Sequence, residues 1–204
     1  MKYFFSIILF FLSINTSFAQ WSVGIEGGLN IAKFSPSNLR DGSELSYKNG
    51  IVIGGSINYK FNEYFTIHSG LRYNQRGGKI SHNNPGFVGD ATKYFDYLEI
   101  PVKFIYVPFD IELKPVLIFG TDISYILLAK GEGTINNQRI SEDDTGNIDN
   151  RIDVFLETGI GIMPALTGEL YYSLSVSYYY GVFDIDEYIT TSGIHLLVGI
   201  YFKL

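Results

Sequence analysis

The stretch YLEIPVKFIYV, residues 97–107, alternates between two kinds of side chain along its length. Because successive side chains of a β-strand point to opposite faces, this stretch separates into an apolar face and a mixed face. The apolar face carries Leu98, Ile100, Val102, Phe104 and Tyr106, and the mixed face carries Glu99, Pro101, Lys103 and Ile105. A strand of a soluble sandwich has the same alternation, so the prediction depends on how often the pattern recurs.

The two-faced pattern recurs in segments that are joined by long and short connections in turn. The segments are residues 21–34, 50–61, 64–77, 97–107, 114–128, 151–163, 169–181 and 193–204. The long connections are 35–48, 77–94, 129–150 and 183–191, and the short ones are 62–63, 108–112 and 164–168. An even strand number, with short turns at one end and long loops at the other, is typical of bacterial outer-membrane barrels.

The distribution of charge between the two faces indicates which face meets lipid. The apolar faces hold bulky aliphatic and aromatic residues, whereas the other faces combine Gly and Ser with charges of both signs. A soluble, lipocalin-like barrel would turn the charged face to water, and a membrane barrel turns it to the lumen. We therefore predict an all-β fold, an eight-stranded antiparallel up-and-down transmembrane β-barrel located in the cell outer membrane.

The charged residues of the inward faces are predicted to form a network inside the barrel. An eight-stranded barrel is about wide enough for its own side chains, so we expect the charges to pair across the lumen and plug it. The predicted network consists of Glu26, Lys60, Arg72, Arg76, Glu99, Lys103, Asp122 and Glu157. A gated or narrow ion path through the same charges is the alternative.

Aromatic residues and one proline add detail to the barrel prediction. Aromatic residues near the segment ends predict girdles at the level of the lipid headgroups. They are Trp21, Tyr59, Phe61, Phe65, Tyr106 and Phe202 at the short-turn end, and Tyr73, Tyr125 and Tyr178 at the loop end. Pro101 lacks a ladder N–H, so we expect either a local bulge or a lumen water that compensates the orphaned carbonyl.

The N-terminus has the pattern of a secretory signal peptide. Lys2 precedes an apolar run over residues 3–12, and the small residues Ser17 and Ala19 predict cleavage after Ala19. We therefore assign residues 1–19 to a signal peptide and residues 20–204 to a single barrel domain. An uncleaved membrane anchor is the alternative, but the apolar run is shorter than the ~20 residues that a helical span needs.

The overall composition excludes several classes of function. Charged residues make up 18% of the 204 residues, against roughly 25% in an average soluble protein. The net charge of −6 and the lack of a basic run argue against a nucleic-acid partner. The chain has no Cys, which excludes disulfides, thiolate metal sites and thiol catalysis.

Several motifs resemble those of the PorT-like outer-membrane β-barrel proteins, often labelled a porin family. These motifs are GLRYNQRGG, YLEIPV, KPVLIFG, SYYYGVFDI and VGIYFKL, and the resemblance covers essentially the whole predicted mature chain. It implies a membrane barrel without a common chemistry and allows an accessory role in the assembly of a secretion machinery. The chain departs from the pattern at Leu204, where such barrels usually end in an aromatic residue.

Support for catalysis or metal binding in the sequence is thin. The histidines are His68, His82 and His195, and His68 and Ser69 point to opposite faces because they are adjacent in a strand. No Gly-x-Ser-x-Gly motif is present. Residues 141–150 gather acidic side chains, but their spacing does not match an EF-hand loop, so we interpret them as a solvated external loop.

We therefore predict a non-enzymatic barrel with a structural, adhesive or assembly-accessory role and no cofactor. The expected partners are outer-membrane lipid, the barrel-insertion machinery and a protein that meets the external loops, where Tyr47, Phe87 and Tyr94 are candidate contacts. We expect a monomer. The alternatives are a lipid-modifying outer-membrane enzyme and a narrow ion or solute channel.

Overall fold

The fold is described from a computed structural model of the chain. The described residues are 20–36, 43–84, 87–135, 138–143, 145, 151–183 and 189–204, so the predicted signal peptide at 1–19 lies outside them. Among the described residues, no helix combines the length and the apolar composition that a membrane span requires.

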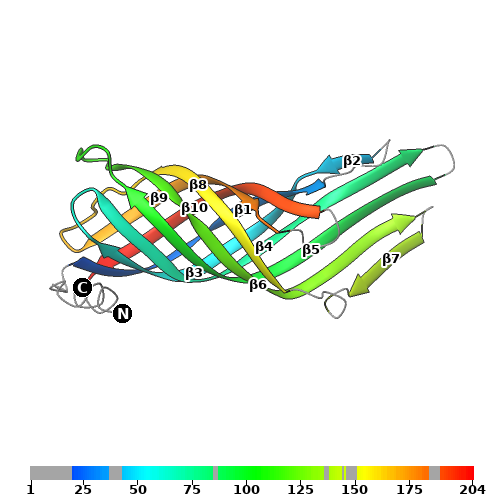
Figure 1. Cartoon of the computed structure of the whole chain (residues 1–204), viewed down its shortest axis with the longest axis horizontal. Coiled ribbons are helices and arrows are strands. Elements are labelled where there is room, and N and C mark those ends of the chain that lie inside the picture. Colours follow the sequence, from blue (N-terminus) through cyan, green and yellow to red (C-terminus); the bar gives the residue numbers. More distant parts are fainter. Residues whose placement is uncertain are drawn as a thin grey trace, which may run out of the picture.

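The structure consists of antiparallel strands that close into a ring (Figure 1). The strands are β1 (Trp21–Pro36), β2 (Ser43–Ser46), β3 (Lys48–Lys60), β4 (Phe65–Asn84), β5 (Phe87–Tyr106), β6 (Pro115–Ile135), β7 (Gln138–Asp143), β8 (Ile152–Ile162), β9 (Leu170–Gly181) and β10 (Ile189–Lys203). In the described part of the chain, the ring runs β1–β3–β4–β5–β6–β8–β9–β10 and closes where β10 pairs with β1. The predicted eight-stranded barrel is therefore confirmed.

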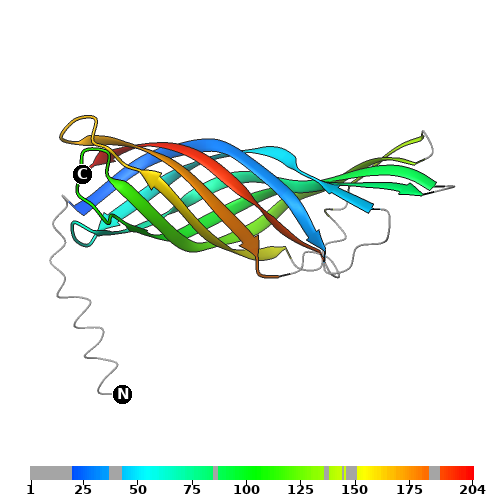
Figure 2. The ribbon, with the colours of Figure 1, turned by 90° about the horizontal axis from the view of Figure 1, so that it is seen from above.

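Both the first and the last strand reach the short-turn end of the barrel. The backbone N–H of Leu204 donates to the carbonyl of Trp21 at 2.9 Å, which joins the two strands at that end. The strands wrap obliquely around the barrel axis, and several continue far beyond the ring at the opposite end (Figure 2). We call the first end the short-turn rim. We call the strand extension at the other end the protrusion; it consists of β2, β7 and the adjoining ends of β4, β5 and β6.

The protrusion replaces much of what the sequence predicted as loops. Residues 77–94 and 129–150 were predicted as loops. In the structure, β4 continues to Asn84 and β5 begins at Phe87, and the two strands pair along this length, while β6 continues to Ile135 and pairs with β7. Outside a membrane, neither face of a strand has to be continuously apolar. The hydrophobic alternation therefore stops although the hydrogen-bonded ladder continues.

The barrel is apolar outside and polar inside, as the alternation predicts. Outward side chains such as Ile25 and Ile160 are 70% and 64% exposed, whereas inward side chains such as Arg72 and Glu99 are 1% and 0% exposed. Aromatic rings meet on the outside near the short-turn rim, where Trp21 and Tyr59 lie 4.7 Å apart. A strand that is exposed on its apolar face and buried on its charged face suits a lipid environment.

Pro101 lies in a strand whose register is unbroken around it. Ser69 pairs with Val102 and Arg72 with Glu99 in one constant register, but the two positions between them are not paired across the β4–β5 ladder. The irregularity that β5 does have lies between Asp96 and Tyr97, on the side of β6. The expected bulge at Pro101 is therefore not found, and the missing N–H is accommodated by a local gap in the ladder.

Gly77 marks the place where β4 leaves the barrel wall and enters the protrusion. It has a φ of 144°, a backbone conformation that side chains with a Cβ rarely adopt. A Cβ at this position would lie 2.1 Å from the carbonyl oxygen of Lys93 on β5. The glycine therefore allows β4 to change its path without separating from its neighbour.

Candidate functional site

The middle of the lumen is occupied by the guanidinium group of Arg72. Its Nε lies 2.7 Å from Oε2 of Glu99, and its Nη2 lies 2.7 Å from Oδ2 of Asp122 and 3.4 Å from Oε2 of Glu157. The four side chains come from β4, β5, β6 and β8, and they are almost completely buried. Since buried charges are stable only when they are paired and hydrogen-bonded, this arrangement ties one side of the barrel together.

Small residues beside the charges make room for them. Arg72 lies opposite Glu99 in the β4–β5 ladder and opposite Gly54 in the β3–β4 ladder. A Cβ on Gly54 would lie 2.5 Å from the Cβ of Arg72. The mixture of Gly with charged residues on the inward face is therefore a packing requirement of the narrow lumen.

A second part of the network lies toward the short-turn rim. Lys103 Nζ is 2.7 Å from Oε1 of Glu157, and the hydroxyl of Ser177 donates to the same oxygen at 2.6 Å. Glu26 accepts from the hydroxyl of Tyr201 at 3.3 Å and lies 3.6 Å from Nε2 of His68. In this part of the network, both carboxylates, Glu26 and Glu157, therefore have partners inside the barrel.

Arg76 forms the opposite boundary of the network, toward the protrusion. Its Nη2 is 2.6 Å from Oε1 of Glu99. The guanidinium carbon lies 3.5 Å from the ring centre of Phe155, 4.0 Å from that of Tyr179 and 5.6 Å from that of Tyr97. Cation–π contacts of a desolvated guanidinium stabilise by about 2 kcal/mol, so Arg76 joins the charged layer to an aromatic layer.

The aromatic layer was not identified from the sequence. It belongs to a buried cluster that consists of Ala32, Phe34, Phe95, Tyr97, Ile126, Ala129, Phe155 and Tyr179. The alternation of side chains along the strand was the available signal, because it places Phe155 on the same inward face as Asp153 and Glu157. We call this cluster the aromatic layer, and it closes the lumen between the charge network and the protrusion.

The structure places the predicted network residues in two locations. Glu26, Arg72, Arg76, Glu99, Lys103, Asp122 and Glu157 are buried inside the barrel. Lys60, in contrast, is exposed at the short-turn rim and makes no ion pair with the others among the described residues. It faces the open mouth of the barrel because it is the last residue of β3.

A chain of side-chain hydrogen bonds fixes the orientation of His195. Tyr179 donates to Oδ1 of Asn30 at 2.8 Å, and Nδ2 of Asn30 donates to Oδ1 of Asn74 at 2.9 Å. Nδ2 of Asn74 then faces Nε2 of His195 at 3.1 Å. Nε2 therefore accepts, and the proton of the neutral ring is on Nδ1, which lies 3.4 Å from Oε2 of Glu157.

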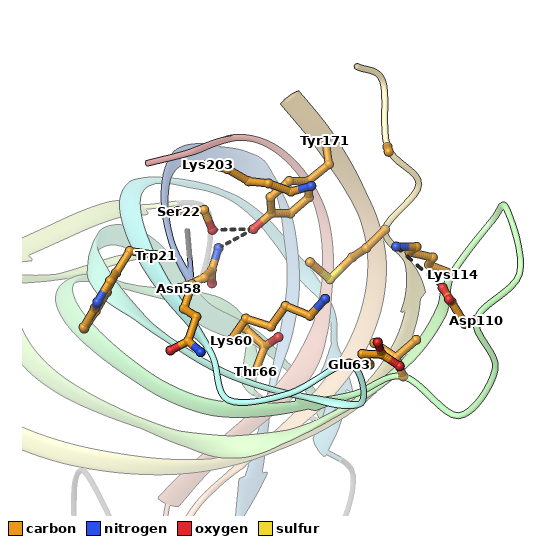
Figure 3. A pocket seen from close by; sticks show the side chains of 14 residues that line it. Trp21, Ser22, Asn58, Lys60, Glu63, Thr66, Asp110, Lys114, Tyr171 and Lys203 are labelled. Carbon is orange, nitrogen blue, oxygen red and sulfur yellow. Dashed lines mark hydrogen bonds and ion pairs between the residues drawn. The ribbon is translucent and has the colours of Figure 1, made fainter. Parts of the chain in front are cut away.

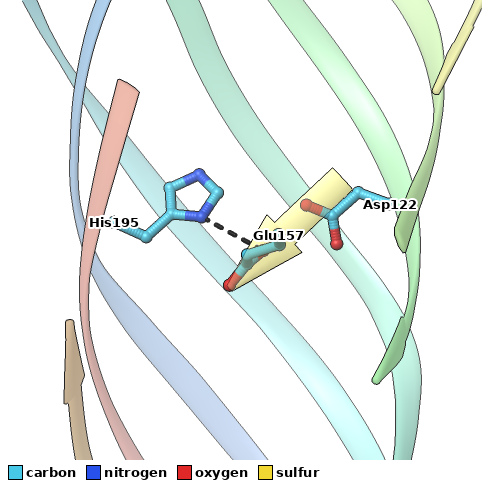
Figure 4. A group of neighbouring side chains, drawn as sticks. All are labelled: Asp122, Glu157 and His195. Atoms are coloured by element: carbon cyan, nitrogen blue, oxygen red, sulfur yellow. Dashed lines mark ion pairs between the residues drawn. The ribbon is translucent and has the colours of Figure 1, made fainter. Parts of the chain in front are cut away.

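One group of side chains among the described residues could offer ligands to a metal ion. It consists of Asp122, Glu157 and His195, whose potential ligand atoms lie within 4.8 Å of one another (Figure 4). Arg72 and Lys103, however, already contact the oxygens of Asp122 and Glu157 at 2.7 Å. A metal ion would have to approach these fixed positive charges in a low-dielectric interior. The group therefore fits a structural ion cluster and not a metal centre.

The other candidates for chemistry are separated by the structure. His68 is buried and its Nδ1 lies 2.8 Å from Oδ1 of Asn58, while Ser69 is on the other face of β4. Glu142 and Asp143 of the acidic segment are exposed on β7. The acidic residues Asp144 and Asp149 lie outside the described residues, as does the side chain of His82.

A comparison with family models identifies the chain. The model described as "Outer membrane protein beta-barrel domain" matches residues 17–187. The chain belongs to this family. It is thus an outer-membrane β-barrel protein, located in the cell outer membrane.

Solved structures of outer-membrane barrels are similar to this outer-membrane β-barrel in architecture. Ail, the attachment invasion locus protein of Yersinia pestis, is 14% identical with a TM-score of 0.45, over 90% of this chain and 99% of that one. OprG of Pseudomonas aeruginosa is 11% identical with a TM-score of 0.45, over 90% and 95%. The protease OmpT of Escherichia coli is 10% identical with a TM-score of 0.39, over 90% and 96%. No curated protein matches the sequence significantly.

The two buried layers predict that this outer-membrane barrel does not conduct ions. We expect the purified protein to give no conductance steps in a planar lipid bilayer, because the charge network and the aromatic layer both fill the lumen. Phe155→Ala removes part of the aromatic layer only, so this variant is also expected to stay closed. Conductance steps in the unmodified protein would contradict the prediction.

Proposed function

We propose that this outer-membrane barrel is a non-enzymatic scaffold that presents the protrusion to a protein partner. The observation that carries the proposal is the length of strand beyond the ring. β2 pairs with β4 from Ser43 to Ser46, and β7 pairs with β6 from Gln138 to Asp143, at the end where β4 and β5 pair up to Asn84 and Phe87. The protrusion is thus a sheet and not a set of separate loops.

The position of the protrusion supports an external role. Bacterial barrels have short periplasmic turns and longer extracellular segments, which supports an extracellular position for the protrusion. Its β7 edge pairs with β6 on one side and with none of the other described strands on the other side. An unpaired strand edge with an exposed Ile140 offers backbone donors and acceptors to another chain.

The state of the lumen supports a role without chemistry inside the barrel. The ionised groups contact one another, and the aromatic layer separates them from the protrusion. Catalytic groups have to reach a substrate, whereas His195 and Glu157 are 0% and 4% exposed. The motifs of the PorT-like family make assembly with a secretion machinery one form of the same proposal.

A variant with a shortened protrusion tests the proposal. Residues 79–92 are replaced by Asn-Gly, which joins Gly78 to Lys93, two residues that face each other in the β4–β5 ladder. Residues 131–142, which include most of β7, are replaced in the same way, which joins Lys130 to Asp143, a facing pair of the β6–β7 ladder. The ring remains intact, so we expect the variant to keep the mobility shift on heating that folded barrels show in detergent gels. We expect cells that carry it to lose adhesion to immobilised host or matrix proteins, relative to cells with the full-length barrel.

Two further measurements separate the proposal from its rivals. A lipid A profile that changes in a deletion strain, and again in His68→Ala or His195→Ala, would favour a lipid-modifying enzyme. Adhesion that is identical with the full and the shortened protrusion would contradict the scaffold proposal. A lipid A profile that is unchanged in all strains, together with loss of adhesion in the shortened variant, is the result we expect.

A further inference from the structure

The mouth of the barrel at the short-turn rim contains a cavity that the network in the lumen does not fill. Its volume is about 200 Å³, and side chains from β1, β3, β9 and β10 contribute to its wall (Figure 3). The wall residues that matter below are Trp21, Ser22, Asn58, Lys60, Tyr171 and Lys203. The cavity lies at the end opposite to the protrusion, so it is independent of the proposed scaffold role.

The wall carries more positive than negative groups. Lys60, Lys114 and Lys203 line the cavity together with the carboxylates Glu63 and Asp110. Lys114 is 3.6 Å from Asp110, and Lys203 donates to the carbonyl of Gly168 at 3.0 Å. Lys60 has no hydrogen-bond or ion-pair partner among the described residues, and its ammonium group extends into the opening (Figure 3).

A buried hydroxyl pair adds one unused donor to the wall. Nδ2 of Asn58 donates to the hydroxyl of Tyr171 at 3.0 Å, and this hydroxyl lies 2.6 Å from Oγ of Ser22. Only one of the two hydroxyl protons can lie between Tyr171 and Ser22. The other is left to donate to a further acceptor, and both residues line the cavity.

The floor of the cavity limits how deep a ligand can go. Asn58 uses its Oδ1 to face Nδ1 of His68 at 2.8 Å, so both ends of its amide are engaged. Below it lies a second void of about 30 Å³ that reaches Glu26 and Lys103. A void of that size holds one or two water molecules. Further into the barrel, the ion pairs of Arg72 close the lumen.

We propose that the rim cavity binds an oxyanion, a phosphate or carboxylate group carried by a small molecule. Lys60 supplies the unpaired positive charge, Lys203 lies on the same opening, and the Ser22–Tyr171 pair supplies a buried neutral donor. Lysine binds phosphate as a point charge, and hydrogen bonds to a charged acceptor are about twice as strong as neutral ones. Met163 provides an apolar part of the wall for a short carbon chain beside the anion.

The test uses Trp21, which is the only tryptophan of the chain and belongs to the strand that borders the cavity at the rim. The full barrel is placed in nanodiscs of phosphatidylcholine, and monobutyl phosphate is titrated while the fluorescence of Trp21 is recorded. We expect a saturable change, and an affinity that falls by about tenfold or more in Lys60→Met. Lys60 is exposed, so the variant keeps its fold, which the mobility shift on heating verifies.

Lys79→Met is the matched control, because Lys79 is also exposed but lies on the protrusion at the other end of β4. In a second series, the nanodiscs contain phosphatidylglycerol and no probe is added. The fluorescence of Trp21 is then compared with its value in phosphatidylcholine nanodiscs. A response that depends on Lys60 supports an oxyanion site, and the series in which it appears assigns the anion to a soluble molecule or to a lipid headgroup. No response in either series, or an equal loss in Lys79→Met, would overturn the proposal.

Discussion

Arg72→Met lowers the free energy of unfolding of the barrel by about 3–5 kcal/mol, the cost of removing one partner from a buried ion pair. The guanidinium group holds Glu99, Asp122 and Glu157 at 2.7–3.4 Å. Glu157 has a second cation in Lys103 at 2.7 Å and Glu99 has one in Arg76 at 2.6 Å, whereas Asp122 has only the more distant Arg76, at 3.6 Å. Methionine fills a similar volume but leaves the three carboxylates in a buried position with less positive charge. Urea unfolding of the protein in lipid vesicles measures the difference.

The matched control for Arg72 is another arginine that is paired in the open. Arg139 lies 3.6 Å from Glu132 on the protrusion, and the two side chains are 79% and 41% exposed. We expect Arg139→Met to change the unfolding free energy by less than about 1 kcal/mol, because exposed ion pairs contribute little. Adding Glu99→Gln and Asp122→Asn to Arg72→Met should restore part of the loss. Equal effects of the Arg72 and Arg139 substitutions would contradict the structural role of the network.

Ile25→Lys is expected to destabilise the barrel by about 2–4 kcal/mol, the range for a lysine on the lipid face near the middle of the membrane. Ile25 lies on β1 next to the buried Glu26 and is 70% exposed on the outside of the ring. In a barrel with inverted faces, the same lysine would meet water at little cost. The measurement is the unfolding free energy in vesicles, together with the yield of heat-modifiable protein in outer membranes.

Ile140→Lys provides the same chemical change outside the membrane. Ile140 is 46% exposed and lies on β7 of the protrusion, where water can solvate the new charge. We therefore expect a change in unfolding free energy within about 0.5 kcal/mol, as for ordinary surface substitutions. If both isoleucine substitutions had the same small effect, the outward face of β1 would not be in contact with lipid.

The local sequence was enough to predict the ring because the strand period is a property of the backbone. Alternation at a period of two places Leu98 outside and Glu99 inside whatever their distant neighbours are. The connection lengths then ordered the segments into a barrel with both termini at one end. This signal weakened where neither face had to be apolar, and the strands of the protrusion were predicted as loops at 77–94 and 129–150.

The contacts across the lumen were decided by the tertiary structure alone. The alternation along each strand shows that Arg72, Arg76 and Lys60 point inward. Their partners, however, depend on the register and the closure of the whole ring, which bring together residues far apart in the chain. Arg72 thus meets three carboxylates, Arg76 lies against Phe155, and Lys60 faces an open cavity at the rim. The sequence by itself determined the strands and their faces. Only the closed ring decided which side chains share the interior.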